Sequence, residues 1–318
     1  MPGSKRPLAL FIISIVTLVW AGNFAAGKFA TAELHPFIIT AARIILGAGF
    51  FLAMLPRPER RDVFKPSMLK LCLPLALTGI ATNLFCFAAG IKLTVPTHSA
   101  IIHAMIPVGV FVIGLVILRE RHNLLAVLGM LIAISGAVYI AFMDEHAQHG
   151  EWIGDLITLA GALAFSSYVV LGRRIIPKAG GAWRALTTGY LIAVPISIPF
   201  LAWGLLHQDW SHISWEAWAG TAYMIFGATF FCYAGHLWSL THLEPLQVSV
   251  FVDIQPMLAT AISAVLHIEK ITGNVVLGGG IAVAGVALVQ IATMPRAIGP
   301  SSPAAPAPAP PPDTAPRS

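Results

Sequence analysis

Ten runs of apolar residues alternate with short polar connections along the chain. Each run is long enough to cross about 30 Å of hydrocarbon as a helix, which takes roughly 20 residues. Because a lipid-exposed backbone must satisfy its own hydrogen bonds, helices are the expected structure. The pattern predicts an all-α polytopic membrane protein with ten transmembrane helices at about 8–28, 37–55, 69–90, 96–118, 124–142, 156–175, 186–206, 217–238, 246–267 and 273–293.

The composition agrees with this prediction. Of the 318 residues, 57% are hydrophobic and only 10% are charged, and the mean hydropathy is +0.80, whereas soluble domains carry about 25% charged residues. The first run is too long for the apolar region of a cleaved signal peptide. We divide the chain into a cytoplasmic N-terminus (1–7), five-helix segments (8–142 and 156–293), an external linker (143–155) and a disordered, proline- and alanine-rich cytoplasmic tail (294–318).

Most of the 19 basic residues fall in connections on the same side as the N-terminus. This bias predicts that both termini are cytoplasmic and that the protein lies in the cell (inner) membrane. The net charge of +5 requires no nucleic acid as a partner. The three cysteines, Cys72, Cys86 and Cys232, fall inside predicted helices without zinc spacing, so we predict no metal, cofactor or disulfide.

The two five-helix segments contain a repeat. Leu128, Gly129, Ile132, Ala133 and Gly136 recur as Leu277, Gly278, Ile281, Ala282 and Gly285, each shifted by 149 (278 − 129). The same shift takes Pro107 to Pro256 and Glu120 to Glu269, and near the front of each half a shift of 145 takes Trp20 to Phe165 and Asn23 to Tyr168. Since each half has five spans, the second copy must enter the membrane from the opposite side, which predicts inverted repeats.

Several motifs resemble one family of membrane proteins. They are "VWAGNFAAGK", "HPFIITAAR" at the entry to the second span, a proline in the fourth span followed by Arg-Glu at its end, the glycine-rich fifth span and "GDLITLAGALAFSSYVVLGRR". In order and duplication they resemble the EamA-type branch of the drug/metabolite transporter superfamily. The resemblance implies a secondary transporter with a central cavity formed by the first four helices of each half, and known members mostly export amino acids and related metabolites.

Polar groups deep in the predicted spans are the candidate site. Trp20, Asn23 and Tyr168 occupy equivalent places in the two halves and could orient a small zwitterion, with core packing as the alternative. Arg43 lies about seven residues into the second span, where it could bind a substrate carboxylate or brace backbone carbonyls. His103 could relay protons or be an ordinary hydrogen-bonded histidine of the bundle.

Two prolines and one acid complete the candidate set. Pro107 and Pro256 interrupt the helical ladder and could act as hinges or as fixed kinks. Asp253 has no counterpart in the first half, where Ala104 occupies the matching position. A carboxylate at that depth could exchange protons, bind a substrate amino group or pair with Arg43. Glu120 and Glu269 are expected to anchor helix ends, and the four repeated glycines to allow close helix packing.

Three classes of function follow from the sequence. A secondary active transporter that exports a small metabolite, with protons as a hypothetical coupling ion, is favoured by the repeat and the intramembrane polar groups. A carrier of sugar phosphates or nucleotide sugars, or a membrane sensor without transport, stays open. An enzyme is not expected, because the sequence shows no catalytic constellation. The predicted partners are a small-molecule substrate and the lipid bilayer, and a homodimer stays open.

Overall fold

The structure is a computed structural model that describes residues 5–117, 124–143, 151–243, 248, 251 and 254–293. Every regular element in this part of the chain is helical, and all but η2, which lies in a polar connection, follow the predicted apolar runs. They are α1 (Arg6–Glu33), α2 (Pro36–Met54), η2 (Arg57–Phe64), α3 (Pro66–Leu75), η3 (Ala76–Thr82), α4 (Asn83–Leu93), α5 (Pro96–Ala104), α6 (Ile106–Ile117), α7 (Leu124–Met143), α8 (Glu151–Lys178), α9 (Ala182–Leu206), α10 (Trp215–Ala222), η4 (Tyr223–Phe231), α11 (Cys232–Leu240), α13 (Gln255–Val265) and α14 (Gly273–Thr293).

Seven helices within the described residues are long and apolar enough to cross a membrane, and two shorter apolar helices, Leu124–Ile140 and Gln255–Val265, accompany them. Large apolar side chains point outward from many of these helices, with Leu206 and Val265 81% and 75% exposed. Such exposure suits a surface covered by lipid rather than water. These features confirm the class of all-α polytopic membrane protein, while the ten-span layout stays a prediction.

Proline marks where several helices begin. Pro36, Pro66 and Pro96 each occupy the first helical position, where the missing N–H costs no hydrogen bond. Before α2, the His35 side chain accepts a hydrogen bond from the Phe37 backbone N–H at 3.2 Å. The motif "HPF" therefore fixes the start of α2 one residue before the predicted limit.

Pro107 and Pro256 hold matching places in two helices. Pro107 is the second residue of α6, which follows a break at Met105, and Pro256 is the second residue of α13. Two π-helical segments also match, because η3 (Ala76–Thr82) shifted by 149 covers 225–231, which lies inside η4 (Tyr223–Phe231). Irregular backbone therefore recurs at equivalent positions of the two halves.

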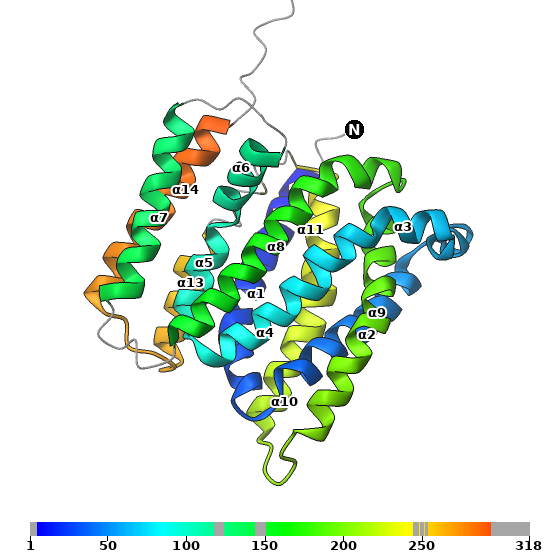
Figure 1. The fold of residues 1–318 in the computed structure, drawn as a ribbon, viewed down its shortest axis with the longest axis horizontal. Helices are drawn as coiled ribbons and strands as arrows, with labels where there is room; N and C mark the ends of the chain where they lie inside the picture. The colour runs from blue at the N-terminus through cyan, green and yellow to red at the C-terminus, as the bar shows by residue number, and fades with distance from the viewer. Residues whose placement is uncertain are drawn as a thin grey trace, which may run out of the picture.

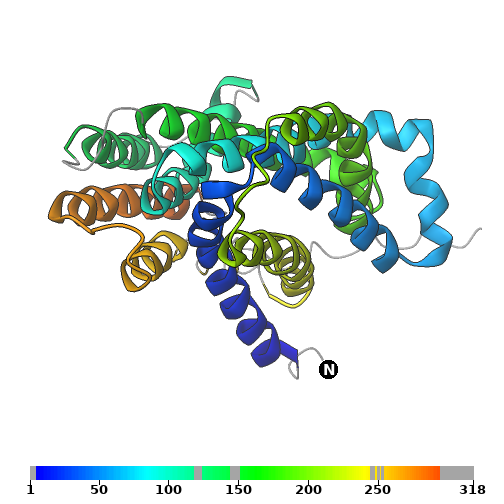
Figure 2. The ribbon, with the colours of Figure 1, turned by 90° about the horizontal axis from the view of Figure 1, so that it is seen from below.

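The helices pair in a regular way. α7 lies beside α14, α2 beside α9, α5 beside α13, α4 beside α8, and α1 beside α10, η4 and α11. The α7–α14 pair forms one edge of the molecule in both views. The segment of η2 and α3 reaches the opposite edge beside α2 and α9, and α1, α4 and α8 lie between the two sides (Figures 1 and 2). One core cluster of buried apolar side chains lies mainly among α1, α4, α5, α10 and α13, and a second lies between α2, α4 and α9.

Glycine allows the backbones of α7 and α14 to touch. A Cβ atom added at Gly136 would lie 2.6 Å from the Gly278 carbonyl oxygen, and one added at Gly129 would lie 2.9 Å from the Gly285 carbonyl oxygen. Only a residue without a side chain permits this approach. The prediction that the four repeated glycines serve close helix packing is confirmed, and they pack against one another.

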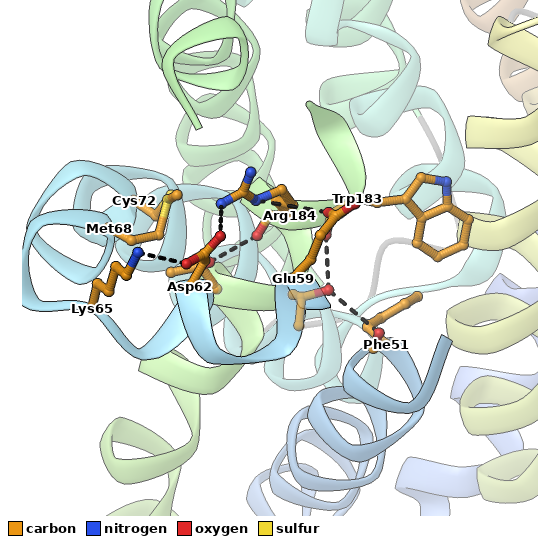
Figure 3. Close-up of polar contacts among 10 residues, drawn as sticks. Phe51, Glu59, Asp62, Lys65, Met68, Cys72, Trp183 and Arg184 are labelled. Atoms are coloured by element: carbon orange, nitrogen blue, oxygen red, sulfur yellow. Dashed lines mark hydrogen bonds and ion pairs between the residues drawn. The ribbon is translucent and has the colours of Figure 1, made fainter. Parts of the chain in front are cut away.

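Charged residues tie the α2–α3 connection to the start of α9 (Figure 3). Arg184 Nη2 lies 3.0 Å from Asp62 Oδ2 and its Nε lies 3.8 Å from Glu59 Oε2, while Lys65 Nζ lies 2.6 Å from Asp62 Oδ1. The hydrogen bond from Lys65 is the main reason why the pKa of Asp62 is lowered. The polar connection is thus held against the bundle by its own charges.

Candidate functional site

A cavity of about 390 Å³ lies where the central helices meet, and it is the candidate site. It brings together six of the residues predicted from the sequence: Trp20, Asn23, Arg43, His103, Pro107 and Pro256. The lining continues to Leu240, the last residue of α11, and to Gln290, in the last turn of α14. Both helices end on the side of the molecule where the N-terminus lies (Figure 1).

Two predicted site residues are not placed on the lining. Tyr168 lies next to the cavity, and its ring stacks on that of Phe165, a lining residue, with 5.3 Å between ring centroids. The ring of Tyr168 packs against Gly79 of η3. Asp253 lies outside the described residues. The roles predicted for both residues stay predictions.

Arg43 is the fixed positive charge of the cavity. Its side chain leaves α2 in the middle of the bundle and is only 4% exposed. Nε donates a hydrogen bond to Thr229 Oγ1 at 3.1 Å, and the guanidinium carbon lies 5.9 Å from the centroid of the Phe87 ring. Nη1 has no hydrogen-bond partner among the described residues. No Asp or Glu is found among the described residues of the lining.

Asn23 and Trp20 line the cavity from α1. Asn23 is 8% exposed, and its Oδ1 has no hydrogen-bond partner in the described part of the chain. Trp20 donates from Nε1 to the Ala228 carbonyl oxygen at 3.0 Å. Its ring lies 5.9 Å from that of Tyr233 and 5.2 Å from that of His236, measured between centroids. An aromatic wall with amide and imidazole groups results.

Sequence reasoning missed Tyr233 and His236, which line the cavity from α11. The shift of 149 takes Leu84 and Phe87 to these two positions, and all four residues line the cavity. Neither Leu84 nor Phe87 was a candidate, so the repeat alone gave no signal for the other two. The shift of 145 likewise relates Trp20 and Phe165, which both line it. Equivalent positions of the two halves therefore meet around one space.

His103 sits in an apolar part of the wall. Its Nδ1 lies 2.9 Å from the Ser99 carbonyl oxygen, and its ring packs edge-on against Phe24 and Phe87 at 5.6 and 5.4 Å between centroids. This placement gives the ring a fixed orientation with a defined tautomer, because Nδ1 must donate to the carbonyl. Its predicted part in proton relay stays a prediction.

Polar contacts join the helices at the other end of the bundle, beyond the cavity. Glu269 Oε1 accepts hydrogen bonds from the backbone N–H of Thr97, at 3.1 Å, and from the Thr97 hydroxyl. Thr97 is the second residue of α5, so the carboxylate caps the positive end of that helix. Burial raises the pKa of Glu269, while the hydrogen bonds from Thr97 oppose that rise. Glu269 is thus an anchor at a helix end, as expected.

Further contacts close the same end. The Thr94 hydroxyl donates to Asp155 Oδ1 at 2.5 Å, His98 Nδ1 lies 3.2 Å from Asp155 Oδ2, and Lys28 Nζ donates to the Thr94 carbonyl oxygen at 2.6 Å. These bonds connect α1, α5 and α8 through the turn between α4 and α5. In the described part of the chain, no three His, Cys, Asp or Glu residues are grouped so as to hold a metal ion.

A bundle of apolar helices around a cavity lined by a few polar side chains, such as Arg43 and Asn23, suits a membrane transport protein, and comparison with known families agrees. The model of the EamA-like transporter family matches residues 7–142 and 152–291. The chain therefore belongs to the EamA-like transporter family and is an integral membrane protein.

Several curated relatives match most of the chain. An uncharacterized transporter of Archaeoglobus fulgidus is 23% identical over 281 residues, with 87% of this chain and 97% of the relative covered. A Salmonella typhimurium protein named "probable amino-acid metabolite efflux pump" is 24% identical over 288 residues, with 87% and 92% covered. The threonine/homoserine exporter RhtA of Salmonella typhimurium is 25% identical over 289 residues, with 87% and 90% covered.

A solved crystal structure shares the fold. It aligns with a TM-score of 0.61 at 18% sequence identity and covers 90% of this chain and 97% of its own. At that identity the match supports the arrangement of the helices and says nothing about the substrate.

Proposed function

We propose that the protein is a secondary active transporter that exports a small metabolite, such as an amino acid or a related zwitterion, across the inner membrane by alternating access. The observation that carries this proposal is a cavity that equivalent positions of both halves line together. Transport by rocking two similar halves requires a binding space at their interface near the middle of the membrane.

The proposed layout has ten spans in two inverted repeats, at 8–142 and 156–293, with both termini cytoplasmic. The helix pairing supports it, because α2 with α9, α5 with α13, and α7 with α14 each bring together the same span of the two halves. A twofold axis in the membrane plane would produce such pairs. The two matches of the family model and the matching π-helical segments agree with this layout.

The contacts at the two ends support an inward-facing arrangement. The cavity lining extends toward the end where the N-terminus lies, while the far end is joined by Glu269, Asp155 and Lys28. In the proposed cycle a cytoplasmic solute binds near Asn23, the helices rock at Pro107 and Pro256, and the bonds at the far end break to release it. Proton entry through Asp253 would then reset the carrier.

The charges of the cavity favour a zwitterion over a phosphorylated cargo. A sugar phosphate or nucleotide sugar needs several cationic groups, and Arg43 is the single Lys or Arg on the described lining. Two of the relatives are named as exporters or efflux pumps of amino acids or their metabolites, which supports the proposed substrate class and the outward direction.

The first test identifies the cargo. Spent medium from cells that overproduce the protein is compared by untargeted mass spectrometry with medium from empty-vector cells. Reproducible excess of an amino acid or small zwitterion supports export. Selective depletion would reverse the direction, excess of a sugar phosphate would replace the substrate class, and identical media would argue for a sensor or another membrane role.

Coupling is tested in proteoliposomes with the identified solute. An imposed pH gradient should drive or alter its flux, and Asp253→Asn should remove that pH dependence while solute binding persists. Flux that ignores the gradient would exclude proton coupling. A dependence that survives in Asp253→Asn would exclude only that residue.

A further inference from the structure

Arg43 presents an uncompensated positive charge to the cavity. Its side chain is 96% buried (100 − 4), and taking a charge out of water is costly unless an opposite charge or strong hydrogen bonds replace the water. The hydroxyl of Thr229 and the face of the Phe87 ring contact it. The phenols of Tyr190 and Tyr233 and the thiol of Cys232 lie close enough to interact with its charge, and all of these groups are neutral in their ordinary form. Nη1 is left without a hydrogen-bond partner among the described residues.

Asn23 supplies the complementary group. Its Oδ1 accepts hydrogen bonds, is buried and has no described partner, and it lines the same cavity from a different helix. A free cationic donor and a free neutral acceptor in one cavity match a ligand with an anionic and a cationic end. A planar guanidinium binds a carboxylate through two parallel N–H···O bonds, which Nη1 and Nη2 can form while Nε stays bound to Thr229.

We infer that Arg43 binds the carboxylate of the cargo and that Asn23 accepts a hydrogen bond from its ammonium group, so the cargo is an α-amino acid or a close analogue. The inference rests on the proposed function and names the substrate class of the same cavity. The aromatic wall of Trp20, Tyr233 and His236 then faces the cargo side chain. A phosphate would leave its second charge unpaired there.

Proteoliposomes containing the full-length protein test this inference. The vesicles are loaded with an equimolar mixture of the common L-amino acids and their primary amides, and the efflux of each compound is followed by mass spectrometry. An amide keeps the amino group and nearly the same shape but lacks the carboxylate. The assay is run at mildly acidic pH, where the amine of the amide is protonated, and efflux from protein-free vesicles is subtracted for each compound. At least one amino acid should leave about 10- to 100-fold faster than its amide, which corresponds to one charge-assisted interaction.

Variants of Arg43 sharpen the test. Arg43→Met should bring the ratio of acid to amide efflux close to one, and Arg43→Lys, which keeps the charge but not the fork, should give an intermediate ratio. Arg174→Met removes an exposed guanidinium at the end of α8 and should leave the ratio as in the wild type. The wild-type ratio decides the question even if an Arg43 variant fails to fold.

Three results would overturn the inference, and they separate it from the proposed function. Equal protein-dependent efflux of acids and amides through the wild type would agree with transport but would refute recognition of a carboxylate by Arg43. The double variant Arg43→Met/Asp253→Asn is a further check. If it recovers the wild-type ratio of acid to amide efflux, Arg43 acts as a structural counter-ion of Asp253 and does not bind the cargo. Efflux of every compound at the rate of protein-free vesicles would refute the inference, and the comparison of spent media then decides whether the protein exports another metabolite.

Discussion

Replacing Gly136 with alanine would place a methyl group against the backbone of α14. The added Cβ would lie 2.6 Å from the Gly278 carbonyl oxygen, whereas ordinary contacts begin at 3.4 Å. The two helices must therefore separate by at least 0.8 Å (3.4 − 2.6). Neither partner can move aside on its own, because the atoms in contact belong to the helix backbone.

The cost of this separation follows from the contacts that it weakens. A gap of about 0.8 Å removes a quarter to a half of the attraction between two atoms, or about 0.05 kcal/mol for each pair. Summed over roughly 40 atom pairs near the helix crossing, the loss is on the order of 2 kcal/mol. Alanine regains about 0.5–1 kcal/mol through its higher helix propensity. We expect a net destabilisation of about 1–1.5 kcal/mol.

Gly280→Ala is the matched control, because Gly280 lies in α14 and nothing lies within 4 Å of a Cβ added there. It should be neutral or slightly stabilising for the same propensity reason. In thermal unfolding of the detergent-solubilised protein, Gly136→Ala should melt about 5 °C below Gly280→Ala. If Gly136→Ala melts at or above the control, the close approach of α7 and α14 is refuted.

Three further predictions concern other contacts. The pKa of Glu269 is raised by burial, so its stabilisation of the closed end is fully present below the ordinary glutamate pKa and is lost as the pH rises through the raised value. A glutamine side chain cannot ionise, so Glu269→Gln should keep this stabilisation at high pH. Backbone hydrogen exchange at the start of α5 should then be slower in the variant than in the wild type at high pH, and equal exchange rates would contradict this. Trp20→Phe should cost about 1 kcal/mol of unfolding free energy, because the bond to the Ala228 carbonyl is lost, and an unchanged melting temperature would argue against that bond. Asp62→Asn should speed tryptic cleavage of the α2–α3 connection several-fold, since the tie to Arg184 is lost, and cleavage at the wild-type rate would show that the tie is not needed.

Hydropathy was sufficient to predict most of the helices. The run predicted at 37–55 is α2 (Pro36–Met54), since a span must be apolar over the full thickness of the bilayer. The internal repeat also predicted that the four glycines serve close helix packing, and the structure shows that this packing lies between α7 and α14. Pro107 predicted an interruption of the fourth span, and the break lies at Met105, two residues before it. The π-helical segments had no such signal, because they depend on packing between helices rather than on composition.

The candidate site was predictable in part. Deep polar groups such as Arg43 and Asn23 were identified because polar side chains are costly inside a membrane, and both line the cavity. Tyr233 and His236 escaped notice because an aromatic ring or a lone histidine in an apolar run usually indicates packing. Tyr168 shows a further limit of the sequence. The repeat predicted its position along the helix but not the direction of its side chain, and its ring packs against Gly79.

The π-helical segments η3 and η4 each insert one extra residue into a span. A wider turn holds one residue more than the α-helical pitch needs, and Thr229 Oγ1, which binds Arg43, also donates to the Met224 carbonyl five residues earlier. Returning that residue to α-helical pitch would turn the chain beyond it by about 100° and advance it by about 1.5 Å. The part of a span on one side of a π-helical turn can therefore rotate relative to the part on the other side. During this rotation each backbone hydrogen bond is replaced by another rather than lost.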